Sequence, residues 1–372
     1  MAMEITPIVM PKWGLEMRQG TVLEWLVSVG DPIERGQALV DVETDKISNA
    51  VEATDPGVLR RIVAASGEVL PVKALLAVMA GPDVSEADID AYIAAYEVPA
   101  AEAEGGDDGP AYLYADVGGI RVRHVRRGPD EGVPALLIHG FGGDLNNWLF
   151  NIDALAGRGP VIAFDLPAHG QTSIALAGAT LGEMAAFVTR FMDAVGVESA
   201  HLIGHSLGGA IAMRLALDAP GRAASLALID SAGFGDDING DYTGGFIRAA
   251  SRRELKPVAQ LLFADDSLVT RQMLDDLLRY KRLDGVTQAL TALDRQLFAG
   301  GRQAEQPGRE LGRFGKPVLV VWGREDRIIP SAQAQAAPEG ARIEILAGAG
   351  HMPQMEKASE VNALLKAHLQ AA

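Results

Sequence analysis

Cysteine is absent from this chain of 372 residues. Disulfide bonds, thiolate metal sites and a cysteine nucleophile are therefore excluded, and a reducing compartment is allowed. No apolar run reaches the roughly 20 residues that a helix needs to cross a bilayer. The N-terminal residues also lack the basic stretch and apolar core of a targeting signal. These absences predict a cytoplasmic protein with no membrane partner.

Basic residues are too few to balance the acids. The chain has 33 lysines and arginines against 49 aspartates and glutamates, a formal charge of −16. A surface of this sign repels nucleic acids and anionic lipids, so neither is an expected partner. A local basic pocket can still bind an acidic small molecule. The length predicts two or three domains, each able to bury its own core.

Residues 1–80 have the pattern of a small all-β domain. Short apolar segments at 20–27, 38–43, 50–53 and 75–79 alternate with turn signals such as GDP at 30–32 and DPG at 55–57. Turns about every 8–12 residues are typical of a sandwich or barrel. Lys46 lies between two of the strand-like segments. We expect it at the exposed tip of a hairpin, where a modifying enzyme can reach it.

This segment resembles the lipoyl domain of 2-oxo acid dehydrogenase acyltransferase components. The resemblance rests on residues 10–11 (MP), 29–31 (VGD) and 43–46 (ETDK), and on Gly57. It implies a barrel-sandwich fold, with lipoate in amide linkage on Lys46. Biotin on the same fold is the main alternative, but the Met-Lys-Met tip that is usual for biotin is missing.

Residues 81–111 differ in composition from the segment before them. Residues 83–98 have a helical apolar period, with Ser85 as the expected N-cap. Residues 99–110 (PAAEAEGGDDGP) are rich in alanine, glycine and acids and have no apolar period. Such a segment cannot bury enough surface to fold, which predicts a flexible linker.

Limited proteolysis is expected to cut within residues 99–110 first, because an unfolded linker exposes its backbone to the protease. Mass spectrometry of the digest should then identify two folded fragments. Protection of this segment for as long as the rest of the chain survives would contradict the prediction and indicate that the domains are fixed together.

Residues 112–372 have the pattern of an α/β domain. A hairpin at 112–126 is followed by near-continuous apolar runs that alternate with helical segments, which indicates a parallel sheet covered on both faces. The runs lie at 134–138, 161–164, 201–203, 226–229, 318–321 and 343–346. Between residues 230 and 316 the strands stop. Helical segments such as 258–263, 271–282 and 288–298 there predict a helical cap at about 233–312.

Residues 204–208 (GHSLG) follow an apolar strand and precede a helix-like segment. A strand, a sharp turn and a helix in this order lift the hydroxyl of Ser206 above the sheet, and the flanking glycines avoid clashes in the turn. A serine nucleophile also needs a base and an orienting acid. His351 and Asp326 each follow a strand, at the edge where open α/β sheets place their sites. The order Ser, Asp, His is the one that this type of fold uses.

The other residues of the expected site are less sharply defined. The remaining six histidines are each expected to be structural. Two acids compete with Asp326, because Glu325 is its neighbour and Asp230 also ends a strand. Glycines in 139–143 (HGFGG) let main-chain N–H groups turn inward. The N–H groups of Phe141 and Leu207 are therefore the expected oxyanion hole.

These motifs resemble the α/β-hydrolase superfamily over about 112–372, and its pattern favours Asp326 as the acid. Together with the lipoyl-type segment, they resemble the dihydrolipoamide acetyltransferase components of acetoin dehydrogenase complexes. That resemblance implies coenzyme A as acceptor. It also implies a thiamine-diphosphate-dependent dehydrogenase and dihydrolipoamide dehydrogenase as partners. The chain departs from better-known acyltransferase components in having no H-x-x-x-D-G segment, and residues 83–98 are short and acidic for a partner-binding domain.

The motifs and the resemblance together leave three functions open. In the first, an acetyl group moves from dihydrolipoyl-Lys46 through Ser206 to coenzyme A. In the second, water replaces the thiol, so the protein is a lipoyl-tethered thioesterase or esterase. In the third, the chain is a non-catalytic carrier and scaffold, against which the complete Ser-Asp-His set argues. The sequence does not distinguish thiol from water as acceptor.

A basic cluster in the predicted cap is a candidate site for the phosphates of coenzyme A. Its members are Arg248, Arg252, Arg253 and Lys256. The first two are four residues apart and would share one face of a single helix, and arginine binds phosphate through paired hydrogen bonds. The alternatives are a solvated helix face with acids such as Glu254, or the basic hairpin residues Arg121, Arg123, Arg126 and Arg127.

Overall fold

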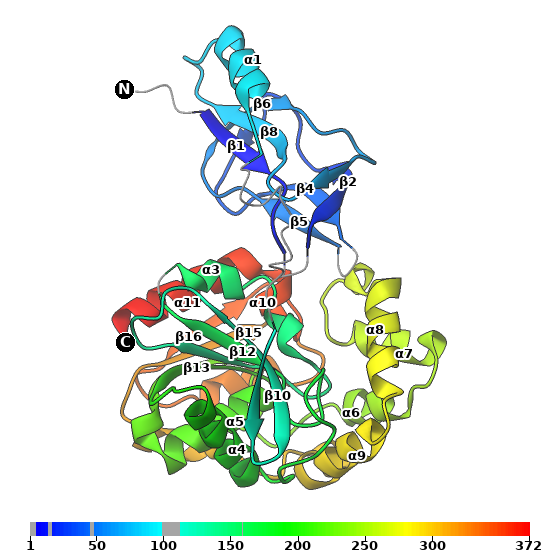
Figure 1. Ribbon diagram of the computed structural model, residues 1–372, viewed down its shortest axis with the longest axis vertical. Coiled ribbons are helices and arrows are strands. Elements are labelled where there is room, and N and C mark those ends of the chain that lie inside the picture. The colour runs from blue at the N-terminus through cyan, green and yellow to red at the C-terminus, as the bar shows by residue number, and fades with distance from the viewer. Residues whose placement is uncertain (1–4, 14–16, 45–47, 99–111, 158) are drawn as a thin grey trace. The chain divides into compact units, whose positions relative to one another are not determined.

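The computed structural model describes residues 5–13, 17–44, 48–98, 112–157 and 159–372. The chain divides into two compact units, Met1–Pro110 and Ala111–Ala372 (Figure 1). Lys46 and residues 99–110, which carry the lipoylation and linker predictions, lie outside the described residues. Among the described helices, none has the length and hydropathy needed to cross a bilayer.

The first unit contains two four-stranded antiparallel sheets packed around one apolar core. The sheets have the orders β1-β8-β6-β3 and β5-β4-β2-β7. The strands are β1 (Ile5–Val9), β2 (Gln19–Trp25), β3 (Pro32–Ile33), β4 (Ala38–Glu43), β5 (Ser48–Glu52), β6 (Gly57–Ile62), β7 (Val69–Pro71) and β8 (Leu75–Ala80). Val22 and Leu39 from one sheet and Leu59 and Leu76 from the other are fully buried in the same core. The predicted all-β fold is confirmed.

Strands β4 and β5 form the hairpin expected around Lys46. They pair antiparallel, with Glu43 opposite Ser48. The connection between them is therefore residues 44–47.

Helix α1 (Glu86–Ala95) follows the last strand of the first unit and lies within the helical segment expected at 83–98. Ser85 caps the helix as predicted, since its side chain accepts a hydrogen bond from Asp88 N. Ile89 packs with Val78 of β8 in a small apolar cluster. Ion pairs of Arg60 and Arg61 with Glu86 hold the same helix from the side. The helix thus belongs to the first unit, because its apolar face is buried against β8.

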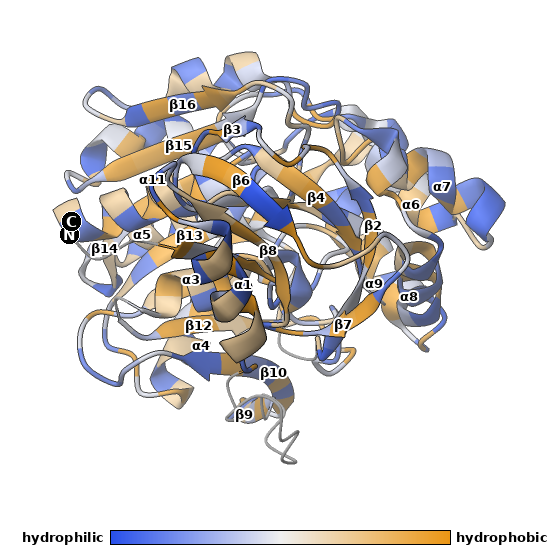
Figure 2. Ribbon diagram, turned by 90° about the horizontal axis from the view of Figure 1, so that it is seen from above, coloured by the Kyte–Doolittle hydropathy of each residue, from blue (hydrophilic) through white to orange (hydrophobic). Residues whose placement is uncertain are grey.

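The second unit is built on an eight-stranded sheet of order β16-β15-β14-β13-β11-β12-β10-β9. Its strands are β9 (Leu113–Val117), β10 (Ile120–Arg127), β11 (Ala135–Ile138), β12 (Val161–Phe164), β13 (Ala200–His205), β14 (Ala223–Ile229), β15 (Val318–Gly323) and β16 (Arg342–Leu346). β9 and β10 pair antiparallel as a hairpin, β10 pairs antiparallel with β12, and the rest of the sheet is parallel. Strand β15 is hydrophobic along most of its length (Figure 2).

Helices cover both faces of this sheet, as the continuous apolar strands predict. Helices α3 (Ile152–Ala156) and α11 (Ala358–Ala371) lie on one face, and α4 (Leu181–Ala194) and α5 (Leu207–Asp218) on the other (Figure 1). The α/β fold class is confirmed. Parallel strands all end at the same edge of the sheet, which brings together residues that are far apart in the chain.

The predicted cap is present between β14 and β15. It contains α6 (Gly240–Arg248), α7 (Arg252–Gln260), α8 (Arg271–Lys281) and α9 (Val286–Leu297). The last three overlap the helical segments expected from the sequence. Helix α6 was not among them, because three glycines in GDYTGGFIR hide its helical pattern.

Candidate active site

Ser206 lies in a sharp turn between β13 and α5. Its φ of 54° and ψ of −119° fall in a region that costs a non-glycine residue about 1–3 kcal/mol, so neighbours must hold it there. The end of β14 does so on both sides of the peptide. Ser206 N donates to Ile229 O at 3.0 Å, and Ser206 O accepts from Ala232 N at 3.1 Å. The hydroxyl is therefore presented beyond the sheet by a fixed main chain.

The glycines on either side of Ser206 are required by close backbone contacts. A Cβ atom on Gly208 would lie 2.1 Å from Ile138 O, and one on Gly204 would lie 2.4 Å from Gly208 O. Real Cβ atoms do not approach backbone oxygens so closely. The expectation that both positions need small residues is confirmed, and the clash with Ile138 shows that the constraint comes from neighbouring β11.

Asp326 and His351 are in direct contact. His351 Nδ1 lies 2.8 Å from Asp326 Oδ2, and both side chains are almost fully buried. Burial acts to raise the pKa of Asp326, but the facing His351 ring and the hydrogen bonds from His351 and Ile328 N outweigh it and lower this pKa. Asp326 therefore stays ionised beside the imidazole, as an orienting acid must.

The two competing acids have other contacts. Glu325 Oε2 accepts from Gly348 N at 3.0 Å and from Ala349 N at 3.2 Å, so this side chain holds the loop before His351. Asp230 is in contact with Asp326 and not with solvent, at 0% exposure. Glu325 and Asp326 are adjacent in the chain but point to different partners.

Ser206 and His351 line one cavity of about 80 Å³ at the carboxyl edge of the sheet. The rest of its wall is mostly apolar, with Phe141 from the loop after β11, Phe246 from α6, and Met273 and Leu277 from α8. The cap thus closes over the serine. An apolar wall of this kind excludes water and strengthens hydrogen bonds inside the cavity.

The expected oxyanion groups lie beside the serine. A Cβ atom on Gly140 would lie 2.9 Å from Ser206 Cβ, so the loop after β11 passes directly over the turn. Within this loop, Gly142 N donates to His169 Nε2 and Gly143 N donates to Gly140 O. The N–H groups of Phe141 and Leu207 have no acceptor among the described residues, which leaves both available to a developing oxyanion.

Three buried histidines frame the loops around the site. His139 Nε2 accepts from Leu166 N, His169 Nε2 accepts from Gly142 N, and His205 Nε2 donates to His351 O. Burial lowers the pKa of His139 to about 4 and the pKa values of His169 and His205 to about 3. These neutral rings are structural, as expected.

A buried ion pair that the sequence did not reveal supports the same loops. Arg123 in β10 makes two hydrogen bonds to Asp165 at 2.7 and 3.1 Å. Asp165 also accepts from Leu145 N and Gln171 N. The sequence did not show that Arg123 is buried, because Asp165, its partner, follows a different strand.

The cap cluster differs from the prediction that Arg248 and Arg252 share one helix face. Arg248 ends α6 and Arg252 begins α7, with a break between the two helices. Arg252 also donates two hydrogen bonds to Asp275 of α8. Arg253 and Lys256 are exposed on α7 and have no ion-pair partner in the described part of the chain.

Asp230, Asp326 and His351 are also close enough to share a metal ion, since one ligand atom of each lies within 4.8 Å of the others. Asp326 Oδ1, however, accepts hydrogen bonds from Ile328 N and Ile329 N. Asp326 Oδ2 faces His351 Nδ1. Because N–H donors point at these oxygens, the cluster suits a hydrogen-bonded relay and not a cation.

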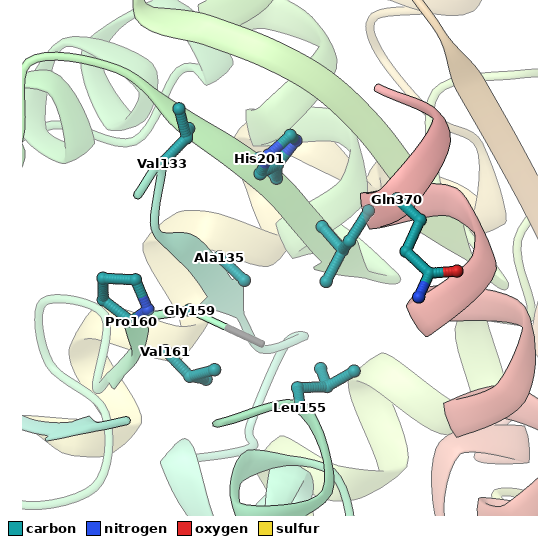
Figure 3. Close-up of a pocket in the computed structure, with 9 residues that line it drawn as sticks. Val133, Ala135, Leu155, Gly159, Pro160, Val161, His201 and Gln370 are labelled. Atoms are coloured by element: carbon teal, nitrogen blue, oxygen red, sulfur yellow. The ribbon is translucent and has the colours of Figure 1, made fainter. Parts of the chain in front are cut away.

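A second cavity of about 210 Å³ lies at the opposite edge of the sheet (Figure 3). Ala135, Val161 and His201 line it where β11, β12 and β13 begin, and Gln370 faces it from α11. Open α/β sheets bind their ligands at the carboxyl ends of the strands. The smaller cavity at Ser206 is therefore the candidate active site.

Each of the two units matches a known protein family. Residues 134–358 match the family described as alpha/beta hydrolase fold, and residues 6–79 match the biotin and lipoyl family described as Biotin-requiring enzyme. A meta-cleavage product hydrolase from Pseudomonas fluorescens superposes with a TM-score of 0.63 at 22% identity, over 70% of this chain and 97% of that one. This likeness supports the fold of the second unit.

Two curated relatives extend over nearly the whole chain. The dihydrolipoyllysine-residue acetyltransferase component of the acetoin cleaving system from Cupriavidus necator is 62% identical over 98% of this chain and 97% of its own length. The component of the same name from Pseudomonas putida is 49% identical over 98% of this chain and 99% of its own.

Proposed function

Because the chain belongs to the family of dihydrolipoyllysine-residue acetyltransferase components of acetoin cleaving systems, we propose that it moves an acetyl group from dihydrolipoyl-Lys46 through Ser206 to coenzyme A. The observation that carries this route is the strained Ser206 turn, which shares a cavity with the Asp326–His351 pair. The β4–β5 hairpin around Lys46, in the same chain, supports the source of the acetyl group.

Lipoate suits the residues present, because β4 and β5 remain paired up to the short connection that contains Lys46. When attached there, the group supplies a thiol that carries the acetyl unit as a thioester. We propose Lys46 as the attachment point and Glu43 as part of the surface that a lipoylating enzyme reads. The other components of the system, a thiamine-diphosphate-dependent dehydrogenase and dihydrolipoamide dehydrogenase, are proposed partners of this unit.

In the proposed reaction, Ser206 Oγ attacks the acetyl carbonyl while His351 Nε2 takes the hydroxyl proton. Asp326 holds Nδ1 and stabilises the imidazolium that forms. The N–H groups of Phe141 and Leu207 donate to the oxyanion, and each such donor contributes about 3 kcal/mol to the transition state. The carbon–sulfur bond then breaks, and His351 returns the proton to the leaving thiol.

The second half repeats these steps with another thiol. His351 takes the proton of the coenzyme A thiol, whose sulfur attacks acetyl-Ser206. The carbon–oxygen bond breaks, Ser206 regains its proton from His351, and acetyl-CoA leaves. The apolar cap wall favours this outcome over hydrolysis, because it limits the access of water to the acyl-serine.

The deciding experiment is to incubate lipoylated protein, acetylated on the lipoyl thiol, with coenzyme A and to quantify acetyl-CoA and free acetate. Acetyl-CoA as the main product supports the proposal. Acetate as the main product would make the protein a lipoyl-tethered hydrolase, and the absence of both products would leave a carrier and scaffold.

The exposed cap residues give a prediction about the acceptor. Charge reversal of Arg248 and Arg253 together is expected to raise the KM for coenzyme A by about tenfold, since two exposed arginine–phosphate hydrogen bonds together contribute roughly 1.4 kcal/mol to binding. Arg252 is left intact so that its contact with Asp275 is not disturbed. Steady-state kinetics with coenzyme A and with a small neutral ester provide the measurement.

The ester rate should not change, and Arg190→Glu on α4 serves as the matched control, because Arg190 is exposed and far along the chain from the cap. An unchanged KM in the double variant would contradict binding of the phosphates by the cap. An equal loss with both substrates would indicate a damaged cap.

A further inference from the structure

Asp230 occupies an unusual position directly beside the proposed relay. It follows β14 with a φ of +42°, in the left-handed region that side chains other than asparagine and aspartate seldom adopt. Its side chain is fully buried. Its carboxyl lies within 4.8 Å of both Asp326 and the ligating nitrogen of His351. The fold therefore places a second acid in contact with the first, away from water.

The two acids differ sharply in the donors that they receive. Asp326 Oδ1 accepts from Ile328 N at 2.8 Å and Ile329 N at 3.0 Å. Asp326 Oδ2 accepts from Trp322 Nε1 at 3.1 Å and faces His351 Nδ1 at 2.8 Å. These are the contacts of an ionised carboxylate, whose two oxygens accept hydrogen bonds and donate none.

Asp230 accepts fewer hydrogen bonds than Asp326. Its Oδ1 accepts from Gly323 N at 3.0 Å. Its Oδ2 has no N–H or O–H donor among the described residues, and the Asp326 carboxyl lies close to the Asp230 side chain. A buried carboxylate oxygen with no donor is strongly disfavoured, whereas a carboxylic acid hydroxyl at that atom would have an acceptor in Asp326.

Electrostatics leads to the same assignment. The titratable groups that face Asp230 are Asp326, Glu356 and His351, and two buried carboxyl groups in contact do not both ionise. Burial, followed by the charge of Asp326, raises the pKa of Asp230 well above its usual range. The single proton shared by the pair therefore resides on the acid with fewer donors.

We propose that Asp230 is a neutral carboxylic acid that donates a hydrogen bond to the Asp326 carboxylate and so acts as a positioning residue for the relay. This role rests on the proposed function, since it acts through Asp326 on His351. The donated bond fixes the plane of the Asp326 carboxylate. It also withdraws part of the negative charge that would otherwise stabilise protonated His351.

Infrared spectroscopy tests the protonation state without any assay of activity. The difference spectrum of the wild-type protein minus Asp230→Asn, at neutral pH, is expected to contain the carbonyl stretch of one protonated carboxylic acid. Labelling with isotopic aspartate should shift this band, which distinguishes it from Glu356. Asp241→Asn, at an exposed cap residue, is the control and should lose no such band. If the substitution instead removes the band of an ionised carboxylate, Asp230 is charged in the wild-type protein and the proposal is wrong.

The pH dependence of ester hydrolysis tests the positioning role. Asp230→Asn keeps an N–H donor and tolerates the left-handed backbone, so the acidic limb of its kcat/KM profile should stay in place. Asp230→Ala removes the donor. The Asp326 charge then stabilises the imidazolium more, and the limb should move to higher pH by about one unit, or about 1.4 kcal/mol.

The two readouts separate this proposal from the proposed function. If acetyl transfer fails but the neutral carboxyl and the pH shift are found, the acceptor is wrong and Asp230 keeps its role. Coincident pH profiles for the Asn and Ala variants, with both melting temperatures near that of the wild type, would overturn the positioning role.

Discussion

Ser206→Ala is expected to lower the rate of acetyl-CoA formation by a factor on the order of 10⁴ to 10⁶, because the attacking atom is removed and only binding and the oxyanion donors remain. The fold should persist, since the turn is held by main-chain bonds to Ile229 and Ala232 that the substitution does not touch. Acetyl-CoA formation from the acetylated arm, with intact-mass measurement of the arm itself, gives the result directly. Lipoylation should be complete in the variant.

His351→Ala should be about as damaging as Ser206→Ala, and the double variant should be no worse than either. Members of a relay act as one unit, so their effects do not add. His201→Asn is the matched control, because His201 lies in the same strand as the serine turn but at the opposite end, where it contacts Ser225. Substantial activity in either single variant would remove that residue from the proposed mechanism.

The architecture could be predicted from the sequence wherever one local pattern determined one element. Residues 161–164 were expected as a strand and form β12 with the same bounds, because a four-residue apolar run flanked by turn residues has few alternatives when buried on both faces. The turn at 204–208 is determined in the same way. Its glycines and its place after a strand are local, and the backbone clashes at Gly204 and Gly208 explain why.

The features that the sequence did not reveal depend on how one segment meets another. The helical period of 83–98 was visible, but nothing in it showed that Ile89 packs against Val78. Spacing placed Arg248 and Arg252 on one helix, whereas Ala249, Ala250 and Ser251 break the helix and Ser251 caps the next one. The apolar period of a helix describes that helix alone. It does not show where the next helix begins or what the helix packs against.

The three acids of the candidate site show the same limit. Asp230, Glu325 and Asp326 each follow a strand, and the sequence could not rank them without the family pattern. In the structure Glu325 turns toward Gly348 N while Asp326 turns toward His351. The turn after β15 decides which of these two neighbouring side chains points into the site. Sequence spacing cannot decide it, because the two positions differ by a single residue.

Lys46→Ala is expected to abolish both lipoylation and acetyl transfer from the arm, the second-largest effect after loss of the nucleophile. In a lipoate-competent host, intact mass should show one addition on the wild-type chain and none on the variant. Lys12→Ala is the control, since Lys12 is an exposed lysine of the same unit outside the β4–β5 hairpin. It should be lipoylated like the wild type.

The same variant separates the two sites. Hydrolysis of a small neutral ester by Lys46→Ala should match the wild type, because the β4–β5 hairpin and Ser206 belong to different compact units. Ser206→Ala should give the mirror result, with full lipoylation and no ester hydrolysis. An addition that survives Lys46→Ala would contradict Lys46 as the only attachment site. A parallel loss of ester hydrolysis would mean that the arm-bearing unit is needed to shape the cavity at Ser206.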